Sequence, residues 1–148
     1  MPHAGLMDEE ALGPEAGPLM RAKLHIRGGR RRLRQGKISA GIVTFYDAVS
    51  AAMEWYVASA KRLGRLTVRE DDNLKDDHSL YDILVRAGVL DGSFHYREFD
   101  TLVQKALYED IVDYDYAGVL GRIEAFMTQL GVMPFAEEEL PPEDPSTF

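Results

Sequence analysis

Basic residues gather in one stretch of the sequence, and their spacing suits the binding of phosphates or carboxylates. Between Arg21 and Lys37 there are eight Lys and Arg residues and no Asp or Glu. At helical spacing most of them share one face or its border. That predicted basic face comprises Lys23, Arg27, Arg30, Arg31 and Arg34. A guanidinium presents a planar fork of donors to either anion, so this face predicts a binding site.

The rest of the chain is strongly acidic, which leaves three alternatives for the ligand of the basic face. The chain has 17 basic and 25 acidic residues, so only nine basic residues remain outside the basic stretch. The face could bind RNA, an acidic partner protein or the acids of its own chain. No aromatic side chain lies among the arginines, so an RNA contact would be made to the backbone and would depend on salt.

Other residues that commonly carry chemistry do not form a recognisable motif. No two histidines are spaced as i and i+4, and no His-Glu-x-x-His occurs. The chain has no cysteine, and it contains no phosphate-binding glycine loop or Gly-x-Ser-x-Gly. Acidic pairs are abundant, but Asp113-x-Asp115 lacks the glycine and distal glutamate of a calcium loop. We therefore assign no catalytic residue, metal or cofactor, and favour a protein that is not an enzyme.

Four aromatic residues form a second candidate site. A small-molecule pocket between helices could be lined by Tyr46, Trp55, Tyr114 and Tyr116. Aromatic residues at helical spacing are more often part of a core, so the core interpretation is favoured over the pocket.

The hydrophobic pattern places these residues on helices. Residues 38–62 predict a central helix whose apolar arc is wide enough to need cover on several sides. Gly29 falls on the buried stripe of the preceding helix, where it predicts a close helix contact. The fold class is all-α: a single antiparallel bundle of about five helices with disordered acidic termini. The predicted helices cover about residues 19–35, 38–62, 77–88, 93–109 and 116–131.

The chain divides into one domain and two flanking segments. Residues 1–17 predict a flexible arm, 18–133 the helical bundle and 134–148 a disordered acidic tail. The longest internal loop is 64–77. No apolar run is long enough for a membrane span and no secretory signal is evident, so we expect a cytoplasmic protein that does not bind membranes.

Several local features together resemble the HEPN superfamily. A glycine-containing corner at Gly36 leads into Phe45-Tyr46-Asp47-Ala48, His78 lies near the start of a later helix, and Asp113-Tyr114-Asp115 precedes the last helix. HEPN proteins are four- or five-helix bundles often found beside minimal nucleotidyltransferases. The resemblance covers about residues 19–131 and implies a homodimer, with a nucleotidyltransferase-like protein as a partner.

The chain departs from the nuclease members of that superfamily. Those members carry Arg-x4–6-His near the end of the fourth helix, whereas acids precede Asp113 here and no histidine follows. The resemblance therefore argues against RNase activity. Our leading hypothesis is a non-catalytic, HEPN-like protein that binds a partner protein as a homodimer. The alternative is an RNA-binding or RNA-processing module that uses the basic face.

Overall fold

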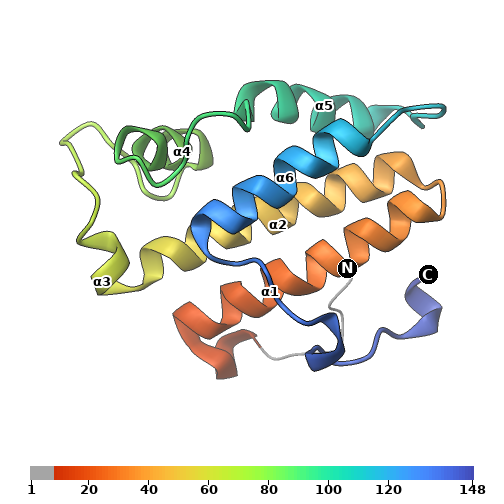
Figure 1. Ribbon diagram of the computed structural model, residues 1–148, viewed down its shortest axis with the longest axis horizontal. Helices are drawn as coiled ribbons and strands as arrows, with labels where there is room; N and C mark the ends of the chain where they lie inside the picture. Colours follow the sequence, from red (N-terminus) through yellow and green to blue (C-terminus); the bar gives the residue numbers. More distant parts are fainter. Residues whose placement is uncertain (1–8) are drawn as a thin grey trace.

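Helices make up most of residues 9–148, the part of the chain that a computed structural model describes (Figure 1). Within these described residues there are six α-helices, two short 3-10 helices and no strand. The all-α prediction is confirmed. The helices are α1 (Glu9–Arg34), α2 (Ile38–Ala58), α3 (Ala60–Leu63), α4 (Asp77–Arg86), α5 (Tyr96–Tyr108), α6 (Ala117–Leu130), η1 (Glu137–Glu139) and η2 (Pro145–Thr147).

The helices α1 and α2 form a hairpin whose corner is closed by Gly36. Gly36 has a φ of 78°, and its N–H bonds the Leu33 carbonyl while the Lys37 N–H bonds the Arg32 carbonyl. This pair of bonds is the glycine-dependent C-cap that the sequence predicts here. The two helices then run side by side.

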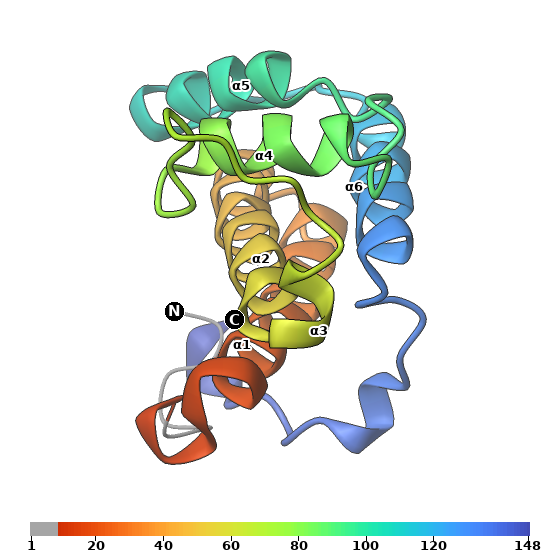
Figure 2. The ribbon, with the colours of Figure 1, turned by 90° about the vertical axis from the view of Figure 1, so that its left-hand side faces the viewer.

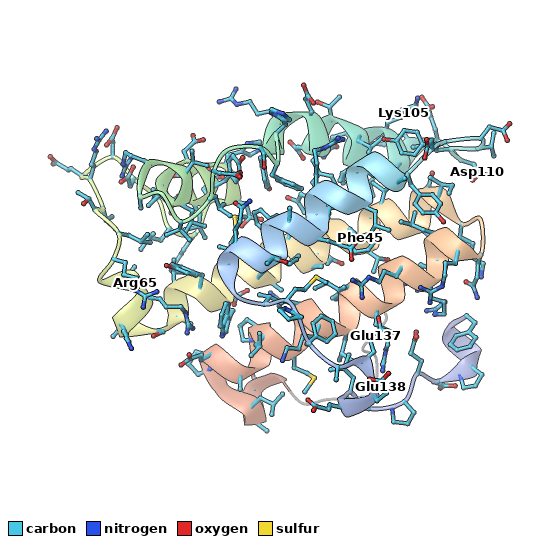
Figure 3. All side chains as sticks on the ribbon, in the orientation of Figure 1. Phe45, Arg65, Lys105, Asp110, Glu137 and Glu138 are labelled. Atoms are coloured by element: carbon cyan, nitrogen blue, oxygen red, sulfur yellow. The ribbon has the colours of Figure 1, made fainter. Side chains whose placement is uncertain are left out.

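Glycine lets the two helices of the hairpin approach closely. A Cβ added to Gly29 would lie 2.6 Å from the ring of Phe45, and one added to Gly41 would lie 2.7 Å from Leu33. Both distances are too short for a real contact, so only glycine fits without a shift of its neighbour. The predicted close contact at Gly29 is confirmed, and its partner, Phe45, lies in the core of the hairpin (Figure 3).

The central position of α2 is visible when the molecule is turned (Figure 2). α2 contacts α1, α5, α6, α3 and α4, and its buried positions include Phe45, Val49, Met53 and Tyr56. Its wide apolar arc is thus covered largely by the chain itself. α4 lies across α2 rather than along it (Figures 1 and 2), so the predicted antiparallel order is not confirmed for the whole bundle.

The 64–76 connection and the start of α4 are held by polar side chains. Arg86 donates to the carboxylate of Asp72 (2.7 Å) and to the Thr67 carbonyl (2.7 Å), which ties the connection to α4. α4 is capped by Asp76, whose side chain accepts from the Ser79 N–H. α5 begins after His95, a few residues later than the predicted start at residue 93.

The two flanking segments differ from the prediction of disorder. Residues 9–17 belong to α1, which is interrupted at Gly13 (φ 90°), while residues 1–8 of the predicted arm lie outside the described residues. Residues 134–148, hereafter the acidic segment, cross α1 with Leu140 buried (Figure 1). Disorder of the acidic segment is therefore not confirmed.

Candidate functional site

The predicted basic face of α1 lies beneath the acidic segment. Arg27 and Arg31 are one helical turn apart, and only 8% and 7% of their surfaces are exposed. Lys23 and Arg30 are partly covered, whereas Arg34 in the last turn is exposed. The structure therefore brings four of the five predicted residues together under one cover and leaves Arg34 outside it.

Carboxylates of the acidic segment pair with these arginines. Glu143 Oε2 accepts from Arg31 Nε at 2.7 Å, and Glu143 Oε1 lies 3.5 Å from Arg27 Nε. Arg30 donates to Glu137 at 3.2 Å and also pairs with Glu124 of α6. Glu137 is seen beside α1 in Figure 3. Of the three alternatives for this face, pairing with the acids of its own chain is the one present in the structure.

Apolar and aromatic groups complete the contact between the acidic segment and α1. The Lys23 ammonium lies 5.7 Å from the centre of the Phe135 ring, and the Arg31 guanidinium lies 4.5 Å from that of Phe148. Both are cation–π distances. Leu140, between these aromatic residues in the sequence, is only 8% exposed. The segment thus combines charged contacts with apolar anchors.

Positive charges crowd one another at the end of this face. Burial, followed by the charge of Arg31, lowers the pKa of Arg32, while Glu143 acts in the opposite direction. Arg32 donates to the Thr44 hydroxyl (3.1 Å) on α2. The carboxylate of Glu143 therefore interacts electrostatically with three arginines, Arg27, Arg31 and Arg32.

The four aromatic residues of the second predicted site are partly buried, and each packs against the hydrophobic core. Trp55 stacks with Arg62, whose guanidinium is 4.0 Å from its ring centre. Tyr46 contacts Tyr96, whose pKa is raised mainly by burial and further by Tyr46. Tyr114 lines a hollow between α5 and α6, and Tyr116 precedes α6.

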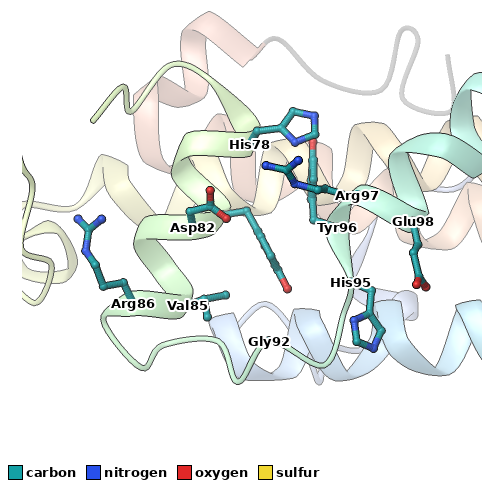
Figure 4. Close-up of a pocket in the computed structure, with 10 residues that line it drawn as sticks. His78, Asp82, Val85, Arg86, Gly92, His95, Tyr96, Arg97 and Glu98 are labelled. Atoms are coloured by element: carbon teal, nitrogen blue, oxygen red, sulfur yellow. The ribbon is translucent and has the colours of Figure 1, made fainter. Parts of the chain in front are cut away.

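A cavity that sequence analysis missed lies between α4 and α5 (Figure 4). Its volume is about 510 Å³, and its walls include the aromatic ring of Tyr96 and charged side chains of both signs. His78 Nε2 is 3.1 Å from Asp100 Oδ2, and His95 lines the cavity with a left-handed backbone (φ 56°, ψ 66°). Nothing in the sequence linked the two histidines, because they are not spaced as i and i+4.

This cavity does not present a recognisable nucleophile and base. Within the part of the chain that the structure describes, no Ser or Thr hydroxyl hydrogen-bonds His78. In that same part, no group of three His, Asp or Glu side chains is placed to hold a metal ion. The cavity is a polar hollow with aromatic side chains in its wall.

Exposed apolar residues concentrate where α5 ends. Tyr108 is 85% exposed, Val112 67% and Leu107 55%, which is unusual for such large side chains. They lie beside the α1–α2 hairpin corner, and Asp110 marks the place in Figure 3. We call Leu107, Tyr108 and Val112, with the neighbouring residues 36–40, the α5 corner.

The backbone of the α5 corner is held by Ser39. The Ser39 hydroxyl donates to the Glu109 carbonyl (2.7 Å) and accepts from the Ile111 N–H (2.8 Å). Ile111 is itself buried. Next to Tyr108, a hollow of about 560 Å³ is lined by Lys37, Ala40 and Asp110, among others. Apolar side chains and a hollow thus lie side by side on a fixed loop.

Because comparisons with known proteins find no match, the functional assignment rests on the observations above. Within residues 9–148, no helix combines the length and apolar character that a membrane crossing requires. The chain matches no protein-family model, no curated protein and no solved structure.

Proposed function

We propose that the chain is a non-catalytic, HEPN-like helical module that binds protein, and that it pairs with a second copy of itself through the α5 corner. The observation that carries this proposal is Tyr108, the last residue of α5, a large aromatic side chain that is 85% exposed beside a loop whose backbone is held by Ser39. Exposed apolar groups that cluster in this way are typical of protein interfaces. Tyrosine in particular is enriched among the residues that dominate binding energy.

The α5 corner is prepared for binding before a partner arrives. The two hydrogen bonds of Ser39 fix the backbone on which Tyr108 and Val112 are carried. A fixed loop loses little conformational entropy on association, which improves affinity for a given contact area. This supports an interface rather than an incidental exposure of apolar groups.

The charges of the corner favour a second copy as the partner. Lys37 lines the hollow from the α1–α2 corner, and Glu109 and Asp110 line it from the segment that follows α5. In a two-fold dimer the same patch faces itself, so a surface that carries both signs of charge can satisfy its own copy. Tyr108 of one copy would then enter the hollow of the other. The proposal includes a cytoplasmic location and a nucleotidyltransferase-like protein as a further partner.

Sedimentation velocity over a dilution series tests the dimer. We expect the wild-type chain to sediment as a dimer at micromolar concentration, and Tyr108→Ser to weaken the dimer by about tenfold or more. Val68→Ser is the matched control, because Val68 is exposed on the 64–76 connection, outside the corner. A wild-type chain that stays monomeric at about 100 μM, or equal effects of the two substitutions, would refute the proposal.

A further inference from the structure

We propose that the basic face of α1 is a binding site for an acidic peptide segment of a partner protein, and that residues 134–148 occupy this site as a built-in substitute. The site is separate from the α5 corner and does not depend on the proposed dimer. Its ligand is an extended peptide that carries carboxylates with an aromatic residue beside them.

The acidic segment is held as a bound peptide would be. Among its residues the only regular structure is two helices of three residues each, Glu137–Glu139 and Pro145–Thr147. Its place over α1 depends on side-chain contacts: Glu137 with Arg30, Glu143 with Arg27 and Arg31, and the rings of Phe135 and Phe148. Recognition of acidic peptides by clustered arginines works in the same way.

The aromatic and apolar contacts of the acidic segment make the site selective for a peptide over a simple polyanion. The rings of Phe135 and Phe148 make cation–π contacts with Lys23 and Arg31, and Leu140 is buried, and a chain of phosphates lacks such groups. Leu140 is buried, so part of the contact is independent of charge. The acidic partner protein is thus favoured over RNA among the two external ligands that the basic face suggests.

The site offers more positive charge than its present occupant uses. Arg27 Nη2 and Arg31 Nη2 are both buried, and neither donates a hydrogen bond to any of the described residues. Glu143 is the single carboxylate of the acidic segment that pairs with these two arginines. A buried donor without an acceptor is costly, so a ligand with a second acidic group at this point would bind better than the built-in segment.

The built-in segment competes with a partner peptide because it is covalently connected to α6, and not because its side chains satisfy every arginine. A covalent connection of this length gives a high effective concentration, which keeps the site filled when no partner is present. A partner that supplies the missing acceptors can displace the segment. The arginines then exchange the carboxylates of the segment for those of the partner. The acidic segment therefore sets the affinity that a partner peptide must exceed in order to bind.

The test uses the full-length chain and a fluorescent synthetic peptide with the sequence of residues 134–148. Glu137→Gln/Glu143→Gln removes the two carboxylates of the built-in segment that pair with arginines of α1, and it keeps the length of the segment. Fluorescence anisotropy should show that this variant binds the peptide about tenfold more tightly than the wild type does, because the internal competitor is weakened. Circular dichroism confirms that each variant is folded.

Two further substitutions, made in the Glu137→Gln/Glu143→Gln variant, locate the peptide. Arg31→Gln should weaken peptide binding by about tenfold, whereas Arg34→Gln is the matched control because Arg34 lies on the same helix but is exposed and outside the contact. A peptide with Ala at the positions of Phe135 and Phe148 should also bind more weakly. Equal effects of Arg31→Gln and Arg34→Gln would overturn the proposal.

Competition distinguishes a peptide site from a general polyanion site. Unlabelled peptide should displace the labelled peptide at a lower concentration than a single-stranded RNA oligonucleotide of equal charge does. If the RNA competes better, or if neither the wild type nor the Glu137→Gln/Glu143→Gln variant binds the peptide at all, the acidic-peptide assignment is wrong.

Discussion

At the scale of single residues, Gly29 sets how closely α1 and α2 can pack. A Cβ at this position would lie within 3 Å of three atoms of the Phe45 ring, and Phe45 is buried in the core. We expect Gly29→Ala to lower the free energy of unfolding by about 1–3 kcal/mol, because the ring must shift in a packed interior. Urea unfolding followed by circular dichroism measures this loss.

The control for Gly29 is a helical glycine with open space around it. Gly121 lies inside α6 and is exposed, and a Cβ added to it would have no neighbouring atom within 4 Å. Gly121→Ala should therefore raise the free energy of unfolding by about 0.5–1 kcal/mol, since alanine loses less conformational entropy in a helix. If both substitutions stabilise the chain, the close contact at Gly29 does not matter.

A second residue-scale prediction concerns Asp72 and pH. The hydrogen bond from Arg86, followed by that from the Arg69 backbone, holds the pKa of Asp72 below its ordinary value. A carboxylate with a lowered folded-state pKa stabilises the fold above its unfolded pKa of about 3.9 and loses that contribution as the pH falls through the lower folded value. The Asp72 contribution is thus present at neutral pH and disappears in acid.

Thermal melting at two pH values measures this contribution. Asp72→Asn should melt at a lower temperature than the wild type at pH 7, and the difference should shrink below about pH 4. Glu70→Gln is the control, because Glu70 is an exposed acid in the same connection. A difference between wild type and Asp72→Asn that is the same at both pH values would show that the ion pair contributes nothing.

The residues that sequence analysis interprets well are those whose role depends on local backbone or helical spacing. Gly29, Gly36 and Gly131 were predicted as a close contact and two helix ends, and each has that role. His78 and His95 were not linked, because the cavity they line arises from the packing of α4 on α5. A contact between two separate helices leaves no periodic pattern in a single sequence from which it could be predicted.

At the scale of helices and loops, Ser39 connects the start of α2 to the loop after α5. Ser39→Ala removes both of its hydrogen bonds and leaves the Ile111 N–H and the Glu109 carbonyl without this partner. We expect the free energy of unfolding to fall by about 1–3 kcal/mol. Hydrogen exchange of the Ile111 amide should accelerate at the same time.

Thr101 provides the comparison for Ser39. Its hydroxyl donates only to the Arg97 carbonyl within α5 (3.0 Å), and the side chain is exposed. Thr101→Ala should therefore change the stability by no more than about 0.5 kcal/mol. Equal losses for Ser39→Ala and Thr101→Ala would mean that Ser39 does not fix the corner.

The helices were predictable at this scale, but the acidic segment was not. The apolar spacing of the four helices after α1, leaving out the single turn α3, placed each of them to within a few residues. The composition of 134–148, rich in Glu and Pro, predicts disorder because such a segment buries little apolar surface by itself. Its position depends instead on arginines more than a hundred residues earlier, such as Arg31, and composition cannot report that pairing.

At the scale of the whole molecule, the structure changes the reason for expecting a dimer. The resemblance implied a dimer without locating its interface, and the wide apolar arc of α2 is covered mostly by α1, α5 and α6. The exposed apolar side chains are instead Leu107, Tyr108 and Val112, which are far along the chain from most of the arc. The helical fold class and the positions of the four longer helices after α1 follow from sequence periodicity, whereas the interface depends on which face remains uncovered after folding.

Pulsed electron paramagnetic resonance between two copies tests the proposed dimer most directly. The chain has no cysteine, so Gln35→Cys places one spin label beside the α5 corner and Lys61→Cys places one beyond the opposite end of α2. α2 is about 30 Å long. We expect a defined distance between the two Gln35→Cys labels that is clearly shorter than that between the two Lys61→Cys labels. No dipolar coupling from either label, or a shorter distance for Lys61→Cys, would contradict the proposal that two copies meet at this corner.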